Sequence, residues 1–323
     1  MDRNLAMEFV RVTEAAALNS ARWMGKGNKI AADDAAVRAM RSLFDTIDID
    51  GTVVIGEGEM DEAPMLYIGE KVGRGIGDKV DIAVDPLEGT NLVAKGMNGA
   101  IAVLAIAPSK TLLHAPDMYM EKIAVGPKAA GVISLEKSIE DNVRDVAQAL
   151  QKSIEELTVV ILDRPRHEQH IQAIRKVGAR IKLITDGDVS PAVATAIHNT
   201  GVDMLLGIGG APEGVLAAAA LHCLGGDMQG RLVPEDENDV ARAKKLGITD
   251  VNKILKMSDM VKSDDVIFAA TGITDGELLK GIRFHADRAT THTLMIRGKT
   301  GTMRLIEADH FYATKPVYFK MNG

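Results

Sequence analysis

The second half of the chain alternates between short apolar runs and segments with helical periodicity, and this alternation restricts the possible folds more than any other feature. The apolar runs lie at residues 157–162, 181–184 and 204–206, and the helical segments lie at 167–177, 192–197 and 214–224. Such alternation predicts βαβ units, in which helices connect neighbouring strands. We therefore expect an α/β structure beyond about residue 150.

The first half has a different pattern, in which helices come first and strands follow. Apolar residues recur at helical spacing from Leu5 to Ala16, and a second helix is expected from about Ala35. Strands are predicted at 52–55, 80–84 and 100–107, and a C-terminal hairpin is predicted around 297–301. The change of pattern predicts two halves, residues 1–150 and 151–323.

The composition limits the kinds of partner that the protein can have. Its 323 residues carry a formal net charge of −7, which argues against nucleic acid because binding to a phosphate backbone normally needs a net basic face. The single Cys223 cannot form an intramolecular disulfide, the N-terminal residues lack the apolar run of a signal peptide, and no long apolar run predicts a membrane span. We therefore expect a cytoplasmic protein with no nucleic-acid or membrane partner.

The hexapeptide Asp85-Pro86-Leu87-Glu88-Gly89-Thr90 directly follows the apolar run at 80–84 and is the most informative motif. Its proline fixes φ and its glycine permits a tight turn, so that the two carboxylates can converge on one point. Clustered carboxylates are costly unless a cation neutralises them, and oxygen ligands suit Mg²⁺ or Mn²⁺. Backbone N–H groups at Gly89 and Thr90, ahead of a short helix, would bind an anion. The alternative is a turn whose acidic residues cap a helix.

Three further acidic residues are candidate ligands. Glu57 follows the apolar run at 52–55 within Gly56-Glu57-Gly58-Glu59, which taken alone is typical of a flexible acidic turn. Asp33 lies near the expected start of the second helix, where an N-cap is the alternative role. Glu213 follows two glycines and could simply be a favourable charge in the first turn of a helix. Two strand ends that each carry a carboxylate beside glycine favour a cation site.

Basic residues that could bind a phosphate are few and clustered. Arg164-Pro165-Arg166 lies just past a predicted strand, where open α/β sheets bind ligands, although a solvated surface pair is the alternative. Asp186-Gly187-Asp188 follows another predicted strand and could bind sugar hydroxyls or cap the next helix. Tyr119 could expose its hydroxyl at the edge of the core. His167 and His170 are interpreted as a solvated pair on a helix.

Together these motifs resemble those of bacterial class II fructose-1,6-bisphosphatases, which belong to the lithium-sensitive, metal-dependent phosphatase superfamily. The pairing of Gly56-Glu57 after one strand with Asp85–Thr90 after the next is similar to the superfamily pattern. Longer stretches resemble the class II enzymes at residues 49–59, 61–70, 115–122, 165–167, 186–189, 207–214 and 270–274. The resemblance covers nearly the whole chain.

The resemblance implies a layered α/β sandwich of the sugar-phosphatase type, with residues 1–150 as the metal-binding half, residues 151–323 as the sugar-phosphate-binding half and the metal site at the seam between them. It implies ligation of Mg²⁺ or Mn²⁺ by Asp33, Glu57, Asp85, Glu88 and Glu213. It implies substrate contacts from Glu88, Gly89, Thr90, Tyr119, Arg164, Pro165, Arg166, Asp186, Gly187, Asp188 and Gly210. A homo-oligomer is also implied. Asp34 is an additional carboxylate where some relatives have glycine.

The implied activity is hydrolysis of the C1 phosphate of fructose 1,6-bisphosphate to fructose 6-phosphate and phosphate, a step of gluconeogenesis. Thr90, with Asp33 or Glu57, is expected to orient the attacking water. The arginine pair and Tyr119 are expected to hold the 6-phosphate.

Three alternative functions remain open. The first is hydrolysis of sedoheptulose 1,7-bisphosphate, alone or in addition, because the two substrates share the phosphorylated C1 end. A more distant one is an inositol monophosphatase-like enzyme, which the Arg164–Arg166 pair disfavours because it offers a second phosphate a site. The last is a non-catalytic sugar-phosphate-binding regulator, which the complete set of five carboxylates and Thr90 disfavours.

Overall fold

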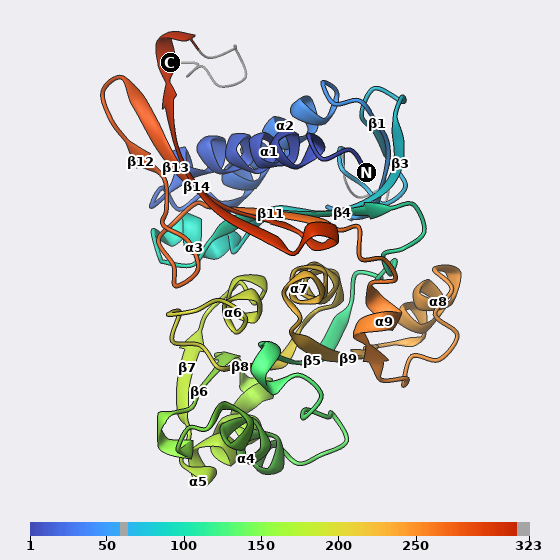
Figure 1. Cartoon of the computed structure of the whole chain (residues 1–323), viewed down its shortest axis with the longest axis vertical. Coiled ribbons are helices and arrows are strands. Elements are labelled where there is room, and N and C mark those ends of the chain that lie inside the picture. The colour runs from blue at the N-terminus through green and yellow to red at the C-terminus, as the bar shows by residue number, and fades with distance from the viewer. Residues whose placement is uncertain (59–63, 315–323) are drawn as a thin grey trace. The chain divides into compact units, whose positions relative to one another are not determined.

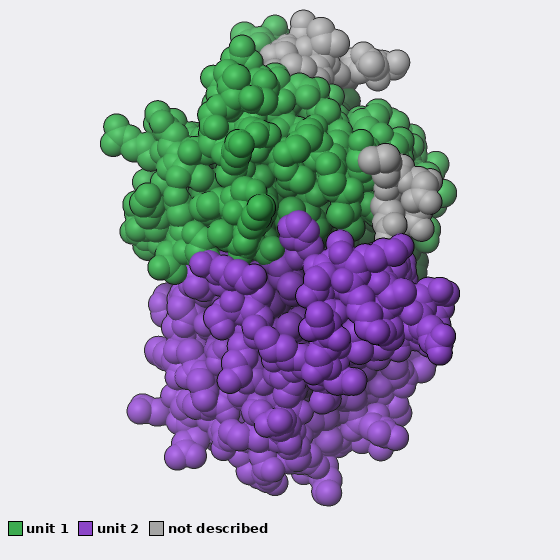
Figure 2. All heavy atoms as spheres, turned by 90° about the vertical axis from the view of Figure 1, so that its right-hand side faces the viewer, with its two compact units in different colours: residues 1–112, 263–323 green, residues 113–262 purple. Residues whose placement is uncertain are grey.

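The computed structural model describes residues 1–58 and 64–314. The chain divides into two compact units, which Figure 2 draws in green and purple. Unit 1 consists of Met1–Leu112 and Ser263–Gly323, and unit 2 consists of Leu113–Lys262. The boundary expected at residue 150 does not coincide with this division, because the last strands of the chain return to the sheet that the first strands build.

Over the described residues, unit 1 contains one mixed sheet of eight strands. In chain order these strands are β1 (Ile49–Ile55), β2 (Lys71–Val72), β3 (Asp78–Glu88), β4 (Ile101–Pro108), β11 (Ile267–Gly272), β12 (Arg283–Phe284), β13 (Arg288–Arg297) and β14 (Thr302–Phe311). They lie side by side in the order β12-β13-β11-β4-β3-β1-β2, with β14 paired to β13. β1 and β3 are parallel, whereas β3 and β4 are antiparallel.

The interior of this sheet follows directly from the apolar runs. β4 lies between β3 and β11 and is buried along almost its whole length, so that the strand predicted at 100–107 is confirmed. β13 and β14 form the predicted C-terminal hairpin, in which Arg297 pairs with Thr302 and Gly301 adopts a left-handed conformation with φ of 56°. Glycine tolerates this conformation because it has no Cβ atom.

Among the residues that the structure describes, three α-helices belong to unit 1, namely α1 (Leu5–Ser20), α2 (Lys29–Phe44) and α3 (Thr90–Lys95). α1 and α2 pack against each other and against the sheet, as Figure 1 shows. The apolar face of α1 is buried, as its periodicity predicted, with Phe9 and Val12 fully covered. α2 begins six residues earlier than the expected Ala35, because the Asn28 side chain accepts a hydrogen bond from the Ala31 N–H at 3.0 Å and caps the helix.

Unit 2 contains a second mixed sheet, of six strands among the residues described. In chain order these strands are β5 (Tyr119–Val125), β6 (Thr158–Leu162), β7 (Arg180–Ile184), β8 (Met204–Gly210), β9 (Asp227–Val233) and β10 (Leu255–Lys256). Their order across the sheet is β10-β9-β5-β8-β6-β7. The predicted βαβ units are confirmed for β6, β7 and β8, which are parallel, while β5 and β9 join the sheet antiparallel.

Helices cover both faces of this second sheet. In chain order they are α4 (Ile139–Leu150), α5 (Glu168–Val177), α6 (Val189–Ala194), α7 (Ala211–Leu224), α8 (Glu237–Lys245) and α9 (Met257–Met260). Side chains of α4 and α5 share an apolar core with β5, β6 and β8, and α6 and α7 lie on the other side of the sheet in Figure 1. The mixed α/β fold and the layered sandwich are therefore confirmed. No helix among the described residues combines the length and apolar character needed to cross a membrane.

Candidate active site

The acidic residues of unit 1 lie where β1 and β3 end. These strands are parallel, with Ile55 opposite Ala83, so that Glu57 and Asp85 follow at the same edge of the sheet. β3 does not end at Val84 as predicted, but continues to Glu88 through an irregularity between Asp85 and Glu88. Pro86 lies within it, since a residue without an N–H group is tolerated where the ladder is interrupted.

Gly89 separates this strand from α3. Its φ of 91° is left-handed, and an added Cβ atom would lie 2.9 Å from Cδ1 of Leu92. Glycine therefore permits the chain to change direction between the buried Glu88 and the half-buried Thr90, which begins α3. The tight turn predicted at Gly89 is therefore confirmed.

Asp33 lies inside α2, so that the alternative role of a helix cap is excluded. A side-chain hydrogen bond joins Asp33 to Glu57. Burial raises the pKa of the Asp33 carboxyl, the negative charge of Asp34 raises it further, and the Glu57 hydrogen bond partly opposes both. Asp34 itself is exposed and lies 3.6 Å from Arg38 on the same helix. Tertiary contact thus brings Asp33 and Glu57 together from segments that are separate in the sequence.

The turn that carries Glu57 is held by its backbone. The Glu57 N–H donates to the Leu66 carbonyl at 3.0 Å, and the Ile68 N–H donates to the Gly58 carbonyl at 2.9 Å. A Cβ atom at Gly56 would lie 1.9 Å from the same Leu66 oxygen. Glu57 is therefore fixed by close packing and not part of a freely flexible turn. Glu59 and the motif residues 61–63 lie outside the described residues.

The donors in unit 1 suit a divalent cation by their chemistry. Asp33, Glu57, Asp85 and Glu88 supply carboxylate oxygens, the ligands preferred by Mg²⁺ and Mn²⁺. Over residues 1–58 and 64–314, however, no three acidic, histidine or cysteine side chains lie close enough together to hold a metal ion. Carboxylates repel one another unless a cation or a proton intervenes. Asp33 and Glu57 interact through their side chains, and the metal site that would include them stays a prediction.

Arg166 makes more contacts in unit 2 than Arg164 does. Its guanidinium lies 4.6 Å from the centre of the Tyr119 ring and donates from Nε and Nη2 to the Ile208 carbonyl, at 3.1 and 2.7 Å. The Tyr119 residue is 38% exposed, so that ring and guanidinium form an accessible pair. Arg164 donates to the adjacent Asp163 carbonyl at 3.2 Å, and Pro165 begins a short 3-10 turn. The structure thus brings Arg166 and Tyr119 together from distant segments.

His167 is fully buried, so its interpretation as a solvated residue is wrong. Its Nδ1 lies 2.7 Å from the Leu162 carbonyl, and its Nε2 accepts a hydrogen bond from the Ile208 N–H at 2.7 Å. Nδ1 therefore carries the proton and the ring is neutral. Burial lowers the pKa of the imidazole, and the nearby Arg166 charge adds to this effect. Sequence reasoning missed this role because both partners are backbone groups.

Glu213 lies in the first turn of α7, which begins three residues before the expected Gly214. A Cβ atom at Gly210 would lie 1.9 Å from its Oε2, so glycine there leaves room for the carboxylate. This oxygen is buried and has no hydrogen-bond partner among the described residues. Burial raises the pKa of the Glu213 carboxyl, while the positive charge of Lys122 lowers it. A buried carboxylate oxygen without a donor fits a cation ligand.

Lys122 was not predicted to be a site residue, although it belongs to a motif that supports the resemblance. It lies within β5, and its Nζ lies 2.7 Å from Oδ2 of Asp188. Asp188 precedes α6 and is buried, while Asp186 is half-buried and Gly187 between them has φ of 73°. A charged residue inside an otherwise buried strand was the sequence signal for Lys122.

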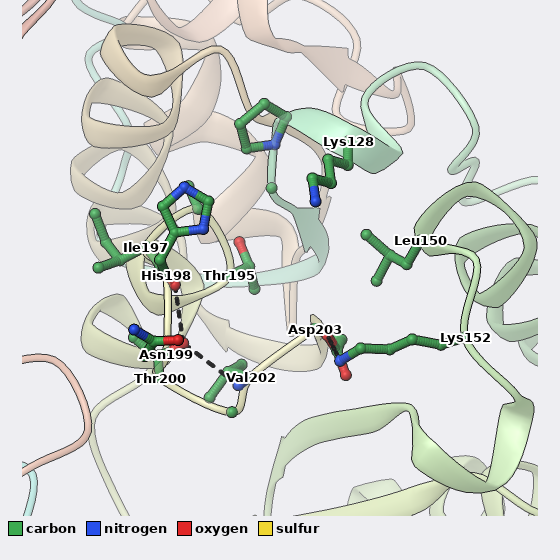
Figure 3. Close-up of a pocket in the computed structure, with 14 residues that line it drawn as sticks. Lys128, Leu150, Lys152, Thr195, Ile197, His198, Asn199, Thr200, Val202 and Asp203 are labelled. Atoms are coloured by element: carbon green, nitrogen blue, oxygen red, sulfur yellow. Dashed lines mark hydrogen bonds and ion pairs between the residues drawn. The ribbon is translucent and has the colours of Figure 1, made fainter.

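A separate cavity of about 600 Å³ lies in unit 2 where β5 ends and β8 begins, and none of the predicted site residues lines it. Figure 3 shows Lys128 and His198 beside it, with Lys152 directed at Asp203. Nζ of Lys152 lies 2.6 Å from Oδ1 of Asp203. Of the two lysines that line the cavity, Lys128 and Lys152, the latter is therefore paired with a carboxylate. Tyr119 and Gly210 lie at the opposite ends of the same two strands.

The predicted site residues therefore fall into two groups. The predicted site residues of unit 1 are Asp33, Glu57, Asp85, Glu88, Gly89 and Thr90. Those of unit 2 are Tyr119, Arg164, Pro165, Arg166, Asp186, Gly187, Asp188, Gly210 and Glu213. Within each unit, contacts join residues that are distant in sequence. A joint metal site at the seam, with Glu213 among its ligands, stays a prediction.

Carboxylates at strand ends in a mixed α/β fold, in a chain that also carries an accessible arginine–tyrosine pair, are typical of a phosphatase that acts on sugar phosphates. The model of the family described as bacterial fructose-1,6-bisphosphatase, glpX-encoded, matches residues 3–310. The chain is 51% identical to the class 2 fructose-1,6-bisphosphatase of Haemophilus influenzae, over 96% of this chain and 97% of the relative. It is 52% identical to fructose-1,6-bisphosphatase 1 class 2 of Escherichia coli K12, over 98% and 97%. The chain belongs to this family of bacterial fructose-1,6-bisphosphatases.

Proposed function

We propose that the protein hydrolyses the C1 phosphate of fructose 1,6-bisphosphate to fructose 6-phosphate and phosphate in gluconeogenesis. The observation that carries this proposal is the identity of about half of all residues, over nearly the full length, with relatives named class 2 fructose-1,6-bisphosphatases. The placement of Arg166 against Tyr119 supports a site for the phosphate that does not react.

We infer that Mg²⁺ or Mn²⁺ is the cofactor, held by Asp33, Glu57, Asp85, Glu88 and Glu213. When bound, such an ion lowers the pKa of a water ligand and neutralises phosphoryl oxygens. The oxygen-only donor set supports this choice, as does the buried Glu213 oxygen.

The chain's own residues divide the remaining work of hydrolysis. Thr90 orients the attacking water through its hydroxyl, and Asp33 or Glu57 accepts a hydrogen bond or a proton from that group. The contact between the side chains of Asp33 and Glu57 supports a shared role for these two acceptors.

The sugar bisphosphate is held at its far end by unit 2. Arg166 forms a charge-assisted hydrogen bond with the 6-phosphate. The Tyr119 ring packs against the guanidinium, and the Tyr119 hydroxyl can donate a hydrogen bond to the same phosphate. Holding the far end reduces the motion of the C1 ester and therefore favours in-line attack.

Hydrolysis of sedoheptulose 1,7-bisphosphate, alone or in addition, remains the nearest alternative, because its C1 end is the same. A non-catalytic regulator would need none of the water-orienting groups, and the contact between Asp33 and Glu57 favours an enzyme over it. We further propose that the protein is cytoplasmic, as its sequence features indicate, and that it forms a homo-oligomer, as the family resemblance implies.

The decisive experiment measures phosphate release from a panel of sugar bisphosphates and monophosphates, with Mg²⁺ and then with Mn²⁺. We expect fructose 1,6-bisphosphate to give the highest kcat/KM, and the fructose product to retain its 6-phosphate. A higher kcat/KM for sedoheptulose 1,7-bisphosphate would favour the alternative substrate. No phosphate release from any substrate with either metal would leave the regulator as the better proposal.

A further inference from the structure

Lys122 is a charged residue inside a central strand of unit 2. Its side chain is 1% exposed, and β5 is paired on both sides, with Lys122 opposite Gly207 of β8 and Gly230 of β9. A lysine is seldom buried in this way unless its charge is paired, because removing an ammonium group from water is costly. The position therefore needs a specific reason.

The Lys122 ammonium contacts two separate segments. It donates to Oδ1 of Asp188 at 2.8 Å and lies 2.7 Å from Oδ2 of the same carboxylate. It also donates to the Gly210 carbonyl at 2.8 Å. One nitrogen atom thus joins the end of the 186–188 loop to the residue that precedes α7.

Two glycines leave the space that this ion pair occupies. A Cβ atom at Gly209 would lie 2.0 Å from Oδ2 of Asp188 and 3.1 Å from Nζ of Lys122. At Gly214, on α7, a Cβ atom would lie 3.4 Å from Cδ of Lys122 and 2.8 Å from Sδ of Met120. The carboxylate therefore lies directly against the backbone of β8, and the lysine stem passes close to α7.

These contacts leave little of Asp188 for a ligand. Its side chain is 8% exposed, and both of its oxygens lie within 2.8 Å of the Lys122 ammonium. Asp186, by contrast, is half-buried, and so is Gly187. A sugar hydroxyl can therefore reach the start of this loop more readily than its end.

We propose that Lys122 is a positioning residue that, through its ion pair with Asp188, fixes the 186–188 loop against Gly210 and the first turn of α7. Asp188 then serves the scaffold, and Asp186 is the residue of this loop that contacts the sugar. The inference rests on the proposed function. It assigns different roles to Asp186 and Asp188, which the sequence analysis treated alike as substrate contacts.

The physical reason for such a residue is the origin of the segments that it joins. The loop follows β7 and the Gly210 carbonyl ends β8, and these strands are separated in the sheet by β6. Binding groups must be held within about half an ångström of their productive positions, and a displacement of about 1 Å can cost on the order of a hundredfold in rate. A buried, fully paired ammonium restricts both segments at once.

The test uses the double variant Lys122→Met/Asp188→Asn, which removes both charges and retains side chains of similar size. We expect a cooperative thermal unfolding transition, and a KM for fructose 1,6-bisphosphate raised about tenfold or more. The matched control is Lys137→Met/Asp145→Asn, which removes an exposed lysine–aspartate pair of 2.7 Å in the same unit. This control is expected to keep the KM of the unaltered enzyme.

A double-mutant cycle with Asp186→Asn separates positioning from a purely structural effect. In the unaltered enzyme, Asp186→Asn should raise KM about tenfold through loss of a contact to the sugar, with little change in Tm. In the Lys122→Met/Asp188→Asn background it should raise KM less than about twofold, because the displaced loop no longer makes that contact. Multiplicative effects would overturn the proposal, as would an unchanged KM in the double variant.

A variant that keeps both charges guards against loss of folding. Asp188→Glu lengthens the carboxylate by one methylene group and shifts the loop relative to Lys122, so it too should raise KM; an unchanged KM in a folded Asp188→Glu protein would overturn the inference. Failure of the unaltered protein to hydrolyse fructose 1,6-bisphosphate would instead overturn the proposed function. The two failures are therefore distinguishable.

Discussion

At the scale of single residues, the two units make different contributions to the proposed chemistry. Unit 1 supplies the neighbouring carboxyl groups of Asp33 and Glu57, and unit 2 supplies the guanidinium of Arg166, which a carbonyl and an aromatic ring hold in place. Removing one group from each set should therefore change different kinetic constants.

Thr90→Ala tests the role of the hydroxyl. We expect kcat to fall by about two to four orders of magnitude, the usual contribution of a group that moves or orients a proton. KM and Tm should change little, because Thr90 is half-buried and its hydroxyl is proposed to act on the water, whereas Gly89 and the metal ions hold the phosphate. Thr90→Ser, which keeps the hydroxyl, is the control in steady-state assays. A Thr90→Ala enzyme with nearly unaltered kcat would contradict the assignment.

Arg166→Ala tests recognition of the second phosphate. A hydrogen bond to a charged group is worth about 1.5–3 kcal/mol, so kcat/KM for fructose 1,6-bisphosphate should fall roughly tenfold to a hundredfold. Hydrolysis of a small monophosphate, which does not extend to this arginine, should change little. Arg164→Ala should act in the same direction with a smaller effect, since this side chain donates to the neighbouring Asp163 carbonyl. Equal losses on both substrates would indicate that the arginines support the fold.

At the scale of secondary structure elements, the backbone of Ile208 in β8 holds two side chains of unit 2, Arg166 and His167. The N–H of Ile208 donates to His167 and its carbonyl accepts from Arg166. The position of the arginine therefore depends on the pairing of β6 with β8 through a buried neutral imidazole.

His167 should make stability depend on pH. Its pKa is lowered in the folded protein, so that between the folded and unfolded values the unfolded chain binds more protons. The free energy of unfolding is then insensitive to this group above about pH 6.5 and falls as the pH drops below it. His167→Gln should lower stability at neutral pH by about 0.5–1.5 kcal/mol for a weakened hydrogen bond, and should flatten the decline between pH 7 and 5. Thermal melts across this range would contradict the assignment if the decline were unchanged.

Gly56→Ala tests the packing behind Glu57. The new Cβ atom would lie 1.9 Å from the Leu66 oxygen, which is a backbone atom and cannot move cheaply. Overpacking of this kind costs about 1–3 kcal/mol, and activity should fall as Glu57 is displaced. Gly276→Ala is the matched control in unit 1, since its nearest neighbour would lie at 3.5 Å. Equal Tm values for the two variants would contradict the packing argument.

At the scale of the whole molecule, each unit has an apolar core of its own. In unit 1 the core joins α1 and α2 to the sheet, and in unit 2 it joins α4 and α5 to β5, β6 and β8. We therefore expect both cores to form without a cation, whereas the proposed reaction needs one.

Removal of divalent cations should separate activity from folding. Exhaustive chelation should abolish phosphate release, and added Mg²⁺ or Mn²⁺ should restore it, because the proposed ligands are carboxylates that repel one another without a cation. The chelated protein should still unfold cooperatively, and metal should raise its Tm by preferential binding to the folded state. Full turnover after exhaustive chelation would contradict the metal proposal.

Features that depend on neighbouring residues could be predicted from the amino-acid sequence. Helical spacing predicted α1, the fully apolar run predicted β4, and the alternation beyond residue 150 predicted the parallel strands of unit 2. The acidic motifs were found in the same way, because the turn that proline and glycine permit and the charge of the carboxylates depend on a few adjacent residues. The resemblance to the family could therefore be recognised from these motifs before any tertiary contact was known.

Only the tertiary structure decided the features that depend on distant residues. It placed the last strands of the chain beside β4, so that the compact units do not divide at residue 150. It buried His167 and paired Lys122 with Asp188, two residues separated by 66 positions. Their partners are backbone groups and a carboxylate brought near by sheet pairing, and no local pattern encodes such a meeting. Burial and pairing of charge are properties of the packed chain, since both require that water be excluded from several segments at once.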